Sequence, residues 1–366
     1  MLRSIKLGLS AIFAVCATLA HAQDANWQQE WDKTLAAAKK EGKVVVLAQP
    51  SPAMRNVILK RFTERYGIEV EHIAARSSEV IGRLRSERTA GVYSIDVFMS
   101  NAGTSYGVLY DEKFLDPLPL IRPDVADPKN WKGGELPFTD PEKKYVLLMF
   151  KSVDSFMVIN TKYVKPEEMQ SAKDLLNPKW KGKIATEDPT AGGGGGAGSA
   201  AHFFTEMGPE FIKQMYVGQG TVIQRDRRQL SDWLARGSHP ICLTCHIDDM
   251  RELVKEGFPL VEVFKLSDID NRLTPAPSLL SMANNAPNPN AAKVFVNWMA
   301  SKEALELYSR EAQAATLRSD VDESFLDPRV IPKPGVKYVD YTAYEWVTNG
   351  RRDSAKQVRQ LLKDMK

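Results

Sequence analysis

The chain has 366 residues, of which 43% are hydrophobic and 26% are charged. This composition is typical of a soluble globular protein and excludes a disordered chain, a collagen-like fibre and a small disulfide-rich scaffold. With 49 basic and 46 acidic residues, the formal net charge is only +3. A near-neutral chain has no bulk field for nucleic acid or an anionic membrane surface, so we expect neither as a partner. The length predicts about two domains.

The first 22 residues have the pattern of a secretory signal peptide. Arg3 and Lys6 form a basic start. The uncharged stretch 7–20 that follows is shorter than the roughly 20 residues of a comfortable membrane span. Ala20-His21-Ala22 then provides the small residues of a cleavage site. We therefore expect cleavage after Ala22 and export of a soluble protein to the periplasm, with an uncleaved anchor as the alternative.

Short apolar runs alternate with segments of helical periodicity along the first hundred residues. Trp27, Trp31 and Leu35 mark a first helix by their four-residue spacing, and Gly42 is expected to end it. The next expected elements are strands at 44–49, 68–74 and 95–99, and helices at 54–66 and around 80–84. This β-α-β-α-β order implies a parallel sheet covered by helices on both faces.

The rest of the chain continues the alternation. We expect strands at 145–150, 156–160, 183–186, 241–243, 260–264 and 279–282, and helices at 197–207, 209–217, 228–236, 247–256, 290–300 and 302–312. Val358, Leu361, Leu362 and Met365 have the spacing of a last helix. The expected fold class is therefore α/β.

Three stretches carry a resemblance to a known family. They are 65–70 (RYGIEV) with 95–100 (IDVFMS), 177–185 (NPKWKGKIA) with Asp188-Pro189, and 285–293 (NAPNPNAAK) with 295–299 (FVNWM) and 301–303 (SKE). In this order they resemble the periplasmic substrate-binding proteins of ABC importers, in the ferric-iron-type or family 1 solute-binding group. The similarity covers roughly residues 43–318. It implies a two-lobe periplasmic-binding-protein fold of type II, a Venus flytrap with parallel-dominated sheets and a crossing hinge.

The resemblance also implies a domain organisation and a function. Lobe 1 is expected at 43–150 with 279–310, lobe 2 at 153–278, and a tail that packs on the lobes at 319–366. Such a protein is a receptor rather than an enzyme. It closes its lobes on a small solute and delivers the solute to an inner-membrane ABC permease. We expect a monomer without a cofactor.

Candidate ligand-binding residues lie in the loops after the strands, because ligands of open α/β sheets bind beyond the carboxyl ends of the strands. Most of these loops are rich in small polar residues. The candidates are Ser51, Arg76, Ser77, Ser100, Asn101, Ser155, Asp188, Thr190, Arg225 and Thr244.

Five consecutive glycines at 192–196 precede an expected helix. Free N–H groups and the helix dipole favour an anion at such a start, and glycine permits close approach of the ligand. Gly192, Gly193 and Gly194 are therefore candidates for anion contact, with a flexible loop of no chemical role as the alternative. Arg76 and Arg225 either clamp a carboxylate or phosphate or are solvated surface charges. These features favour an organic or phosphorylated anion as the solute.

Cys242 and Cys245 lie in the sequence Cys-Leu-Thr-Cys-His, which matches the haem attachment pattern. Their place between an expected strand and an expected helix, in an exported protein, favours a disulfide instead. Two free thiols and a covalent haem are the alternatives. The family's iron binders usually carry two adjacent tyrosines near this place, where this chain has Cys245-His246. Ferric ion is therefore the second candidate ligand, with unknown metal-binding residues.

Two further classes of function are weighed against the receptor. Thiamin-degrading enzymes resemble this fold and use a cysteine nucleophile, a role that Cys242 or Cys245 could take with Asp248 or Asp249 as the acid. A disulfide would remove that nucleophile. A structural or adhesion module would have neither a buried polar cleft nor a change of shape on ligand binding.

Overall fold

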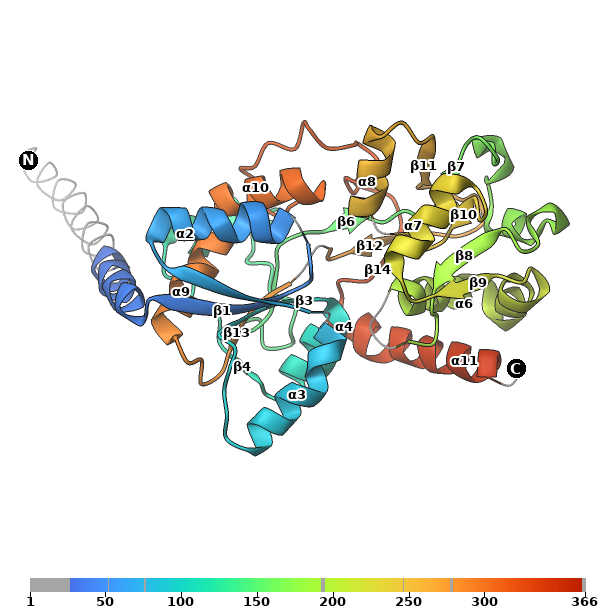
Figure 1. Ribbon diagram of the computed structural model, residues 1–366. Coiled ribbons are helices and arrows are strands. Elements are labelled where there is room, and N and C mark those ends of the chain that lie inside the picture. The colour runs from blue at the N-terminus through green and yellow to red at the C-terminus, as the bar shows by residue number, and fades with distance from the viewer. Residues whose placement is uncertain are drawn as a thin grey trace, which may run out of the picture.

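The computed structural model describes residues 27–363 apart from 52, 76, 192–194, 246 and 277–278, and leaves out the side chains of residues 77–79, 247 and 248. Figure 1 shows two α/β lobes side by side, with a small sheet between them. The expected fold class, α/β with two lobes, is confirmed. Within the described part of the chain, none of the helices combines the length and apolar character needed to cross a membrane.

Lobe 1 is built on a six-stranded sheet with the order β2-β1-β3-β13-β4, in which β5 also pairs with β13. The strands are β1 (Lys43–Ala48), β2 (Glu69–Ala74), β3 (Val97–Ser100), β4 (Leu115–Asp116), β5 (Leu147–Leu148) and β13 (Leu279–Ala283). Val46 of β1 is in register with His72 of β2 on one side and with Val97 of β3 on the other, and both pairs of strands are parallel. β13 runs antiparallel to β3.

The helices of lobe 1 pack around this sheet through large aromatic side chains. They are the helix at 27–41, η1 (Met54–Leu59), α2 (Lys60–Tyr66), α3 (Ser77–Thr89), α4 (Ala102–Thr104), η2 (Ser105–Tyr110), α5 (Pro123–Ala126), η3 (Pro128–Asn130), α9 (Pro289–Met299) and α10 (Lys302–Ala312). Gly67 ends α2 with a left-handed φ of 68°, which glycine adopts without strain. The rings of Phe62 and Phe295 have centroids 5.0 Å apart, and Trp298 completes the cluster. Burying each such ring stabilises the lobe by roughly 1.5–3 kcal/mol.

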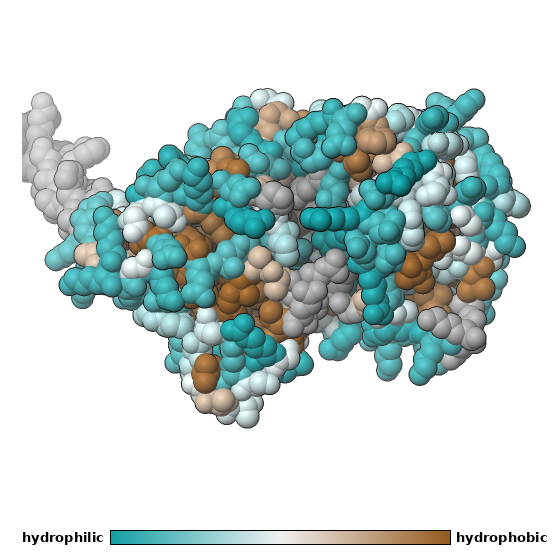
Figure 2. Space-filling view, in the orientation of Figure 1, coloured by the Kyte–Doolittle hydropathy of each residue, from teal (hydrophilic) through white to brown (hydrophobic). Residues whose placement is uncertain are grey.

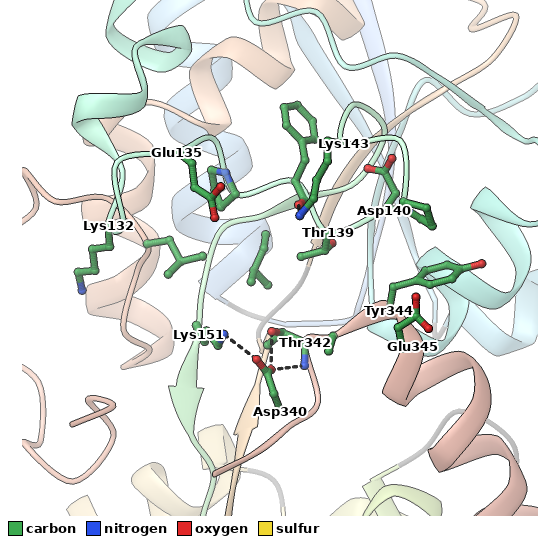
Figure 3. Close-up of a pocket in the computed structure, with 16 residues that line it drawn as sticks. Lys132, Glu135, Thr139, Asp140, Lys143, Lys151, Asp340, Thr342, Tyr344 and Glu345 are labelled. Carbon is green, nitrogen blue, oxygen red and sulfur yellow. Dashed lines mark hydrogen bonds and ion pairs between the residues drawn. The ribbon is translucent and has the colours of Figure 1, made fainter. Parts of the chain in front are cut away.

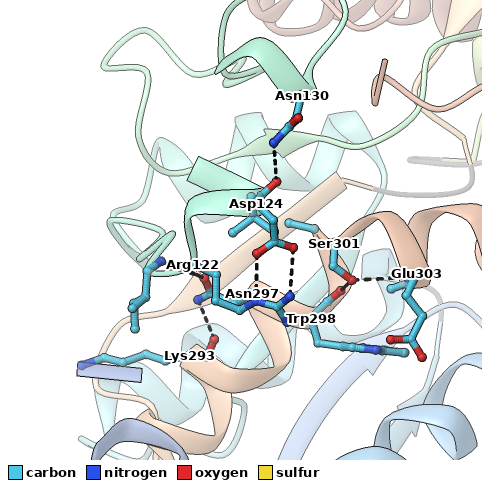
Figure 4. A network of polar contacts seen from close by, with 12 residues as sticks. Arg122, Asp124, Asn130, Lys293, Asn297, Trp298, Ser301 and Glu303 are labelled. Atoms are coloured by element: carbon cyan, nitrogen blue, oxygen red, sulfur yellow. Dashed lines mark hydrogen bonds and ion pairs between the residues drawn. The ribbon is translucent and has the colours of Figure 1, made fainter. Parts of the chain in front are cut away.

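A buried amide fixes the connection before α5 onto α9 (Figure 4). The Asn297 side chain is fully buried, and its Oδ1 accepts hydrogen bonds from the main-chain N–H groups of Ile121 and Arg122. Its Nδ2 donates to the carbonyls of Pro119 and Lys293. All the donor and acceptor positions of one amide are thus used, and they join backbone groups of the loop to α9.

Lobe 2 is built on a five-stranded sheet with the order β11-β7-β10-β8-β9. Its strands are β7 (Met157–Asn160), β8 (Ile184–Glu187), β9 (Val222–Gln224), β10 (Ile241–Cys242) and β11 (Leu260–Val263). Its helices are η4 (Pro166–Glu168), η5 (Ala172–Leu176), η6 (Pro178–Trp180), α6 (Gly195–Lys213), η7 (Gln214–Gly218), α7 (Arg227–Arg236) and α8 (Ile247–Lys255). The helices expected at 197–207 and 209–217 meet at Gly208, whose φ of 81° breaks the helical path within α6.

Both large sheets are mixed, which differs from the expected parallel-dominated sheets. In lobe 2, β10 is parallel to β8 but antiparallel to β7, and β11 is antiparallel to β7. The parallel pairs are those joined by helical crossovers within one lobe. β13 enters lobe 1 after the chain has passed through lobe 2, and it therefore runs in the opposite direction to β3.

A three-stranded sheet lies between the lobes, with the order β14-β12-β6 (Figure 1). It consists of β6 (Ser152–Val153), β12 (Asn271–Thr274) and β14 (Tyr338–Asp340). β6 leads from lobe 1 into lobe 2, and β12 leads back, so these antiparallel strands are the crossing segments. β14 adds the C-terminal segment to them in parallel with β12.

The C-terminal segment continues through η8 (Trp346–Gly350) into α11 (Arg351–Lys363), and it contacts both lobes. Val347 of η8 belongs to a core cluster of lobe 1. Val358 and Leu362 of α11 belong to the core cluster of lobe 2, where α11 packs along α6. On the face seen in Figure 2, hydrophilic residues cover most of both lobes, and hydrophobic patches are most extensive on lobe 1.

Candidate ligand-binding site between the lobes

The candidates in lobe 1 lie where β1 and β3 end, and their polar groups bond to the protein itself. The Ser51 Oγ accepts a hydrogen bond from the N–H of Met54 at the start of η1. Ser100 is fully buried, with its hydroxyl 2.6 Å from that of Ser105. Asn101 caps α4, because its Oδ1 accepts from the N–H of Thr104 at 3.1 Å. These three residues therefore shape the strand ends.

Two other candidates of lobe 1 are described incompletely. Arg76 lies outside the described residues. The backbone of Ser77 begins α3, directly after the end of β2, but its side chain is outside the description. Both stay predictions.

Acidic and basic side chains meet at the end of β8 in lobe 2. Asp188 is buried, and its carboxylate accepts from the N–H and hydroxyl of Thr190 and from the Arg225 guanidinium at 2.8 Å. Partial burial opposes ionisation, but the hydrogen bonds from Thr190 and Arg225 hold the pKa of Asp188 below its usual value. The side chain of Arg225 is 81% exposed. The structure thus places Arg225 on Asp188 at the surface.

The beginning of α6 approaches the end of β8 very closely. A Cβ on Gly196 would lie 2.5 Å from the carbonyl oxygen of Glu187, so only glycine fits there. The N–H of Gly196 donates to Oε2 of Glu187 at 3.3 Å, and Arg227 donates to Oε1 at 2.7 Å. A carboxylate of the protein itself therefore lies at the start of this helix, where an anion is favoured. Gly192, Gly193 and Gly194 lie outside the described residues.

The expected disulfide between Cys242 and Cys245 is confirmed. It closes a short loop after β10, in which the hydroxyl oxygen of Thr244 accepts from the N–H of Glu187 at 2.7 Å. The loop thus joins the ends of β8 and β10. Because both sulfurs are used, neither a cysteine nucleophile nor a thioether to haem is available in this state. Of the acids considered with them, Asp249 lies in α8, while the side chain of Asp248 is outside the description.

The residues around Ser155 lie where the chain crosses into lobe 2. The Ser155 carbonyl accepts from the Arg272 guanidinium at 3.4 Å, and Asp154 accepts from Nε of Arg272 at 2.8 Å. Arg272 is only 7% exposed, and its Nη1 has no hydrogen-bond partner. Burial raises the pKa of Glu262, and a hydrogen bond from the Ser155 side chain opposes that rise. Ser155 therefore bonds to Arg272 and Glu262, next to the crossing strands.

Arg351 of the C-terminal segment lies between the two lobes and was not a candidate from sequence. A Cβ on Gly103 of lobe 1 would lie 3.4 Å from its Nη1, and a Cβ on Gly198 of lobe 2 would lie 3.7 Å from its Nη2. Burial lowers the pKa of Arg351, and the nearby charge of Arg272 lowers it further. Nothing in the local pattern of the last helix distinguishes this arginine, because only the tertiary structure brings it to the strand ends.

Tyr341 connects Arg351 to the crossing strands. Its hydroxyl lies 3.4 Å from the carbonyl oxygen of Gly198, and its ring stacks on Trp346 with centroids 3.8 Å apart. The guanidinium carbon of Arg272 lies 5.8 Å from the centroid of the same ring. Arg272 thus lies against the ring of Tyr341, and Arg351 shares the neighbour Gly198 with the Tyr341 hydroxyl. We call Arg351, Gly103, Gly198, Tyr341 and Arg272 the interlobe arginine site.

No metal centre is evident among the residues that the structure describes, where no group of three or more His, Cys, Asp or Glu side chains could hold an ion. His246, which follows the disulfide, is outside the description. Ferric ion prefers several hard oxygen ligands at one point. Among the described histidine, cysteine and carboxylate side chains, no set of that kind is present.

A separate cavity of about 450 Å³ lies between lobe 1 and the C-terminal segment (Figure 3). Its lysines are bonded to the protein: Lys151 pairs with Asp340 at 2.7 Å, and Lys143 donates to the carbonyl of Phe138. Lys132, at its edge, pairs with Glu323 at 2.6 Å. The lysines of this cavity are therefore already bonded to the protein, and we assign the cavity no ligand.

Two lobes on separate sheets, crossing strands between them and polar strand-end loops define the class of two-lobe solute-binding proteins. The profile of the bacterial extracellular solute-binding proteins matches residues 46–306, and the chain belongs to this family. Members of the family bind small solutes and work with ABC permeases, so this chain is a solute-binding protein of an ABC importer.

Solved structures of the same fold have different ligands. AfuA from Actinobacillus pleuropneumoniae, with exogenous fructose-6-phosphate bound, is 17% identical with a TM-score of 0.66, over 88% of this chain and 99% of that chain. The ferric binding protein from Campylobacter jejuni is 18% identical with a TM-score of 0.67, over 87% and 98%. The Trichodesmium protein IdiA (FutA), in complex with iron and citrate, is 19% identical with a TM-score of 0.60, over 87% and 99%. At these identities the likeness establishes the fold alone.

Proposed function

We propose that this protein is a periplasmic receptor that captures a small organic or phosphorylated anion by closing its two lobes and delivers it to an inner-membrane ABC permease. Export follows cleavage after Ala22, and the mature protein acts as a monomer. Lobe 1 comprises 43–150 and 279–310, lobe 2 comprises 153–278, and the tail at 319–366 packs on both.

The observation that carries the preference for an anion is the presence of guanidinium donors without acceptors in the interlobe arginine site. The Arg272 guanidinium has one carboxylate partner, Asp154, and its buried Nη1 has no acceptor. The charges that act on Arg351 are those of Tyr341 and Arg272, with no carboxylate among them. Among the described residues, the Arg272 Nη1 and the Arg351 guanidinium thus lack an acceptor in a partly desolvated place, and an anionic solute would supply one.

Ferric ion, bare or with a synergistic anion, is the second candidate. Its support is the fold of the iron-bound and ferric-binding neighbours. The Arg351 guanidinium would then contact the anion, and the metal would need oxygen ligands from elsewhere. A ferric ion alone gives no role to the arginines of the interlobe arginine site, whereas an anionic solute gives them an acceptor.

Small-angle X-ray scattering distinguishes the two candidates. The protein is measured alone and with fructose 6-phosphate, citrate, inorganic phosphate, ferric citrate and a ferric salt. Lobe closure on an anion lowers the radius of gyration with at least one metal-free anion. A decrease that requires iron in every case would support the ferric reading instead, and no decrease with any solute would contradict capture by closure.

A further inference from the structure

We propose that Arg351 binds the anionic group of the solute directly, so that the C-terminal segment is a third wall of the binding site. The inference rests on the proposed function and names the residue that recognises the solute. The family match ends at residue 306, so membership of the family assigns nothing to the segment that contains Arg351.

The first argument is the position of the guanidinium. Its two terminal nitrogens face different lobes, Nη1 toward Gly103 in α4 and Nη2 toward Gly198 in α6. Gly103 follows the strand end at Asn101, and Gly198 lies in the first turn of the helix that follows β8. Both segments are strand-end regions, where ligands of α/β sheets bind. The absence of a side chain at these two glycines leaves room for the arginine.

Second, no residue that the structure describes uses this guanidinium as a hydrogen-bond or ion-pair partner. Among the described residues, none accepts a hydrogen bond from Arg351 or forms an ion pair with it, and its charge environment contains Tyr341 and Arg272. Five N–H donors that are partly withdrawn from water need acceptors, and the planar fork of arginine fits a carboxylate or phosphate in a bidentate way. The neighbouring Arg352, by contrast, is exposed to solvent.

The third argument is that Arg351 lies where the tail passes from one lobe to the other. η8 packs on lobe 1 through Val347, and α11 packs on lobe 2 through Val358. A change in the angle between the lobes must therefore move the two neighbours of Arg351, Gly103 and Gly198, relative to each other. An anion bound to Arg351 contacts both lobes only when they are closed. Binding of the anion therefore favours the closed state.

The test compares Arg351→Met, Arg351→Lys and the matched control Arg352→Met, with circular dichroism to show that each variant folds. The probe is inorganic phosphate, titrated against chloride at constant ionic strength while the melting temperature is followed. We expect phosphate to stabilise wild type and Arg352→Met, with an apparent affinity roughly 10- to 100-fold weaker in Arg351→Met because a charge-assisted bidentate contact is lost. Arg351→Lys should lie between them, since it keeps the charge without the fork.

The outcomes separate this inference from the proposed function. Native mass spectrometry shows whether each variant, purified from the periplasm, still carries a small solute. A solute that is present on wild type and Arg352→Met but absent from Arg351→Met supports the proposal. Equal retention by Arg351→Met, or equal stabilisation of Arg351→Met and wild type by phosphate, overturns the role of Arg351 and leaves the receptor intact. A wild type that carries no solute and is not stabilised by phosphate contradicts both.

Discussion

The guanidinium of Arg251 in lobe 2 donates a hydrogen bond across to the main-chain carbonyl of Ala312 in lobe 1, with Nη2 and O 3.1 Å apart. A second, longer bond reaches the carbonyl of Glu311. Ala312 is the last residue of α10, whose free carbonyls carry partial negative charge. This contact joins the two lobes in addition to the crossing strands and the tail. A side chain of lobe 2 bonds to the end of a helix of lobe 1.

Arg251→Met is therefore expected to favour the open arrangement. Loss of a partly exposed charge-assisted bond costs about 1 kcal/mol, which is roughly fivefold in the equilibrium between open and closed lobes. Scattering should show a larger radius of gyration, and solute affinity should fall by a similar factor. Lys255→Met, in the same helix with an exposed partner in Glu252, is the matched control. Identical scattering and affinity for the Arg251 variant would show that the bond does not bias closure.

Gly196→Ala should destabilise lobe 2 without changing any charge. The new methyl group would lie 2.5 Å from the main-chain oxygen of Glu187, so β8 and α6 would have to separate, at a cost of about 2–3 kcal/mol. Gly82→Ala is the control, because an exposed position in α3 with nothing within 4 Å gains roughly 0.5–1 kcal/mol from the same change. Urea unfolding of both variants measures the difference. If Gly196→Ala changed the free energy of unfolding no more than Gly82→Ala, or raised it, the start of α6 would not be constrained by β8.

His202 is predicted to destabilise the protein in acid. Burial, together with the charge of Arg272, lowers its pKa from 6.5 to about 3, although the Asp270 carbonyl, which accepts from Nε2, opposes this shift. Between these values the unfolded chain binds a proton that the folded protein does not. Stability therefore falls as the pH drops below about 6.5, by up to roughly 1.4 kcal/mol per pH unit from this group.

His202→Gln removes this titration and keeps an N–H donor for Asp270. The ring of His202 stacks on Phe156 and meets Tyr341 edge-on, so the variant is less stable at neutral pH. The informative quantity is the slope of the free energy of unfolding between pH 6.5 and 4, which should be shallower in the variant than in wild type. Parallel slopes would show that His202 is not held neutral in the folded protein.

Asn297→Asp should destabilise lobe 1 strongly at neutral pH. The carboxylate cannot donate, so it would face the carbonyl oxygens of Pro119 and Lys293 in a fully buried place (Figure 4). We expect a loss of about 3 kcal/mol. Asn56→Asp, at an exposed position of η1, should change the stability by less than about 0.5 kcal/mol in the same thermal or urea measurement. A comparable stability for both variants would contradict the network.

Much of the fold follows from local patterns in the sequence. Apolar runs such as 44–49 mark buried strands, and Gly42, with its positive φ, follows the first helix where glycine was expected to end it. β9 and β12 were not expected, because β9 is partly exposed and β12 carries the polar side chains Asn271 and Arg272. The antiparallel direction of β13 depends on the path of the whole chain, which local periodicity does not contain.

Less of the candidate site than of the fold could be predicted from the sequence. The loops that the strands expose could be named, and the pairing of Cys242 with Cys245 followed from their spacing and export. The ion pair between Arg225 and Asp188 joins residues 37 positions apart, and Arg351 lies near Gly103, which is about 250 positions away in the sequence. Contacts at such separations are set by packing of the lobes and the tail, so an arginine in the last helix carries no local sign of its neighbours.

Native mass spectrometry of the mature protein purified from the periplasm tests the central claim most directly, when it is combined with a measurement of bound iron. We expect one small organic or phosphorylated adduct for each protein monomer, released on mild unfolding and free of iron. Iron bound in stoichiometric amount without such an adduct would contradict the preference for an anion. A covalent increment with the mass of haem would contradict the disulfide between Cys242 and Cys245. It would also contradict the proposal that the protein is a receptor without a cofactor.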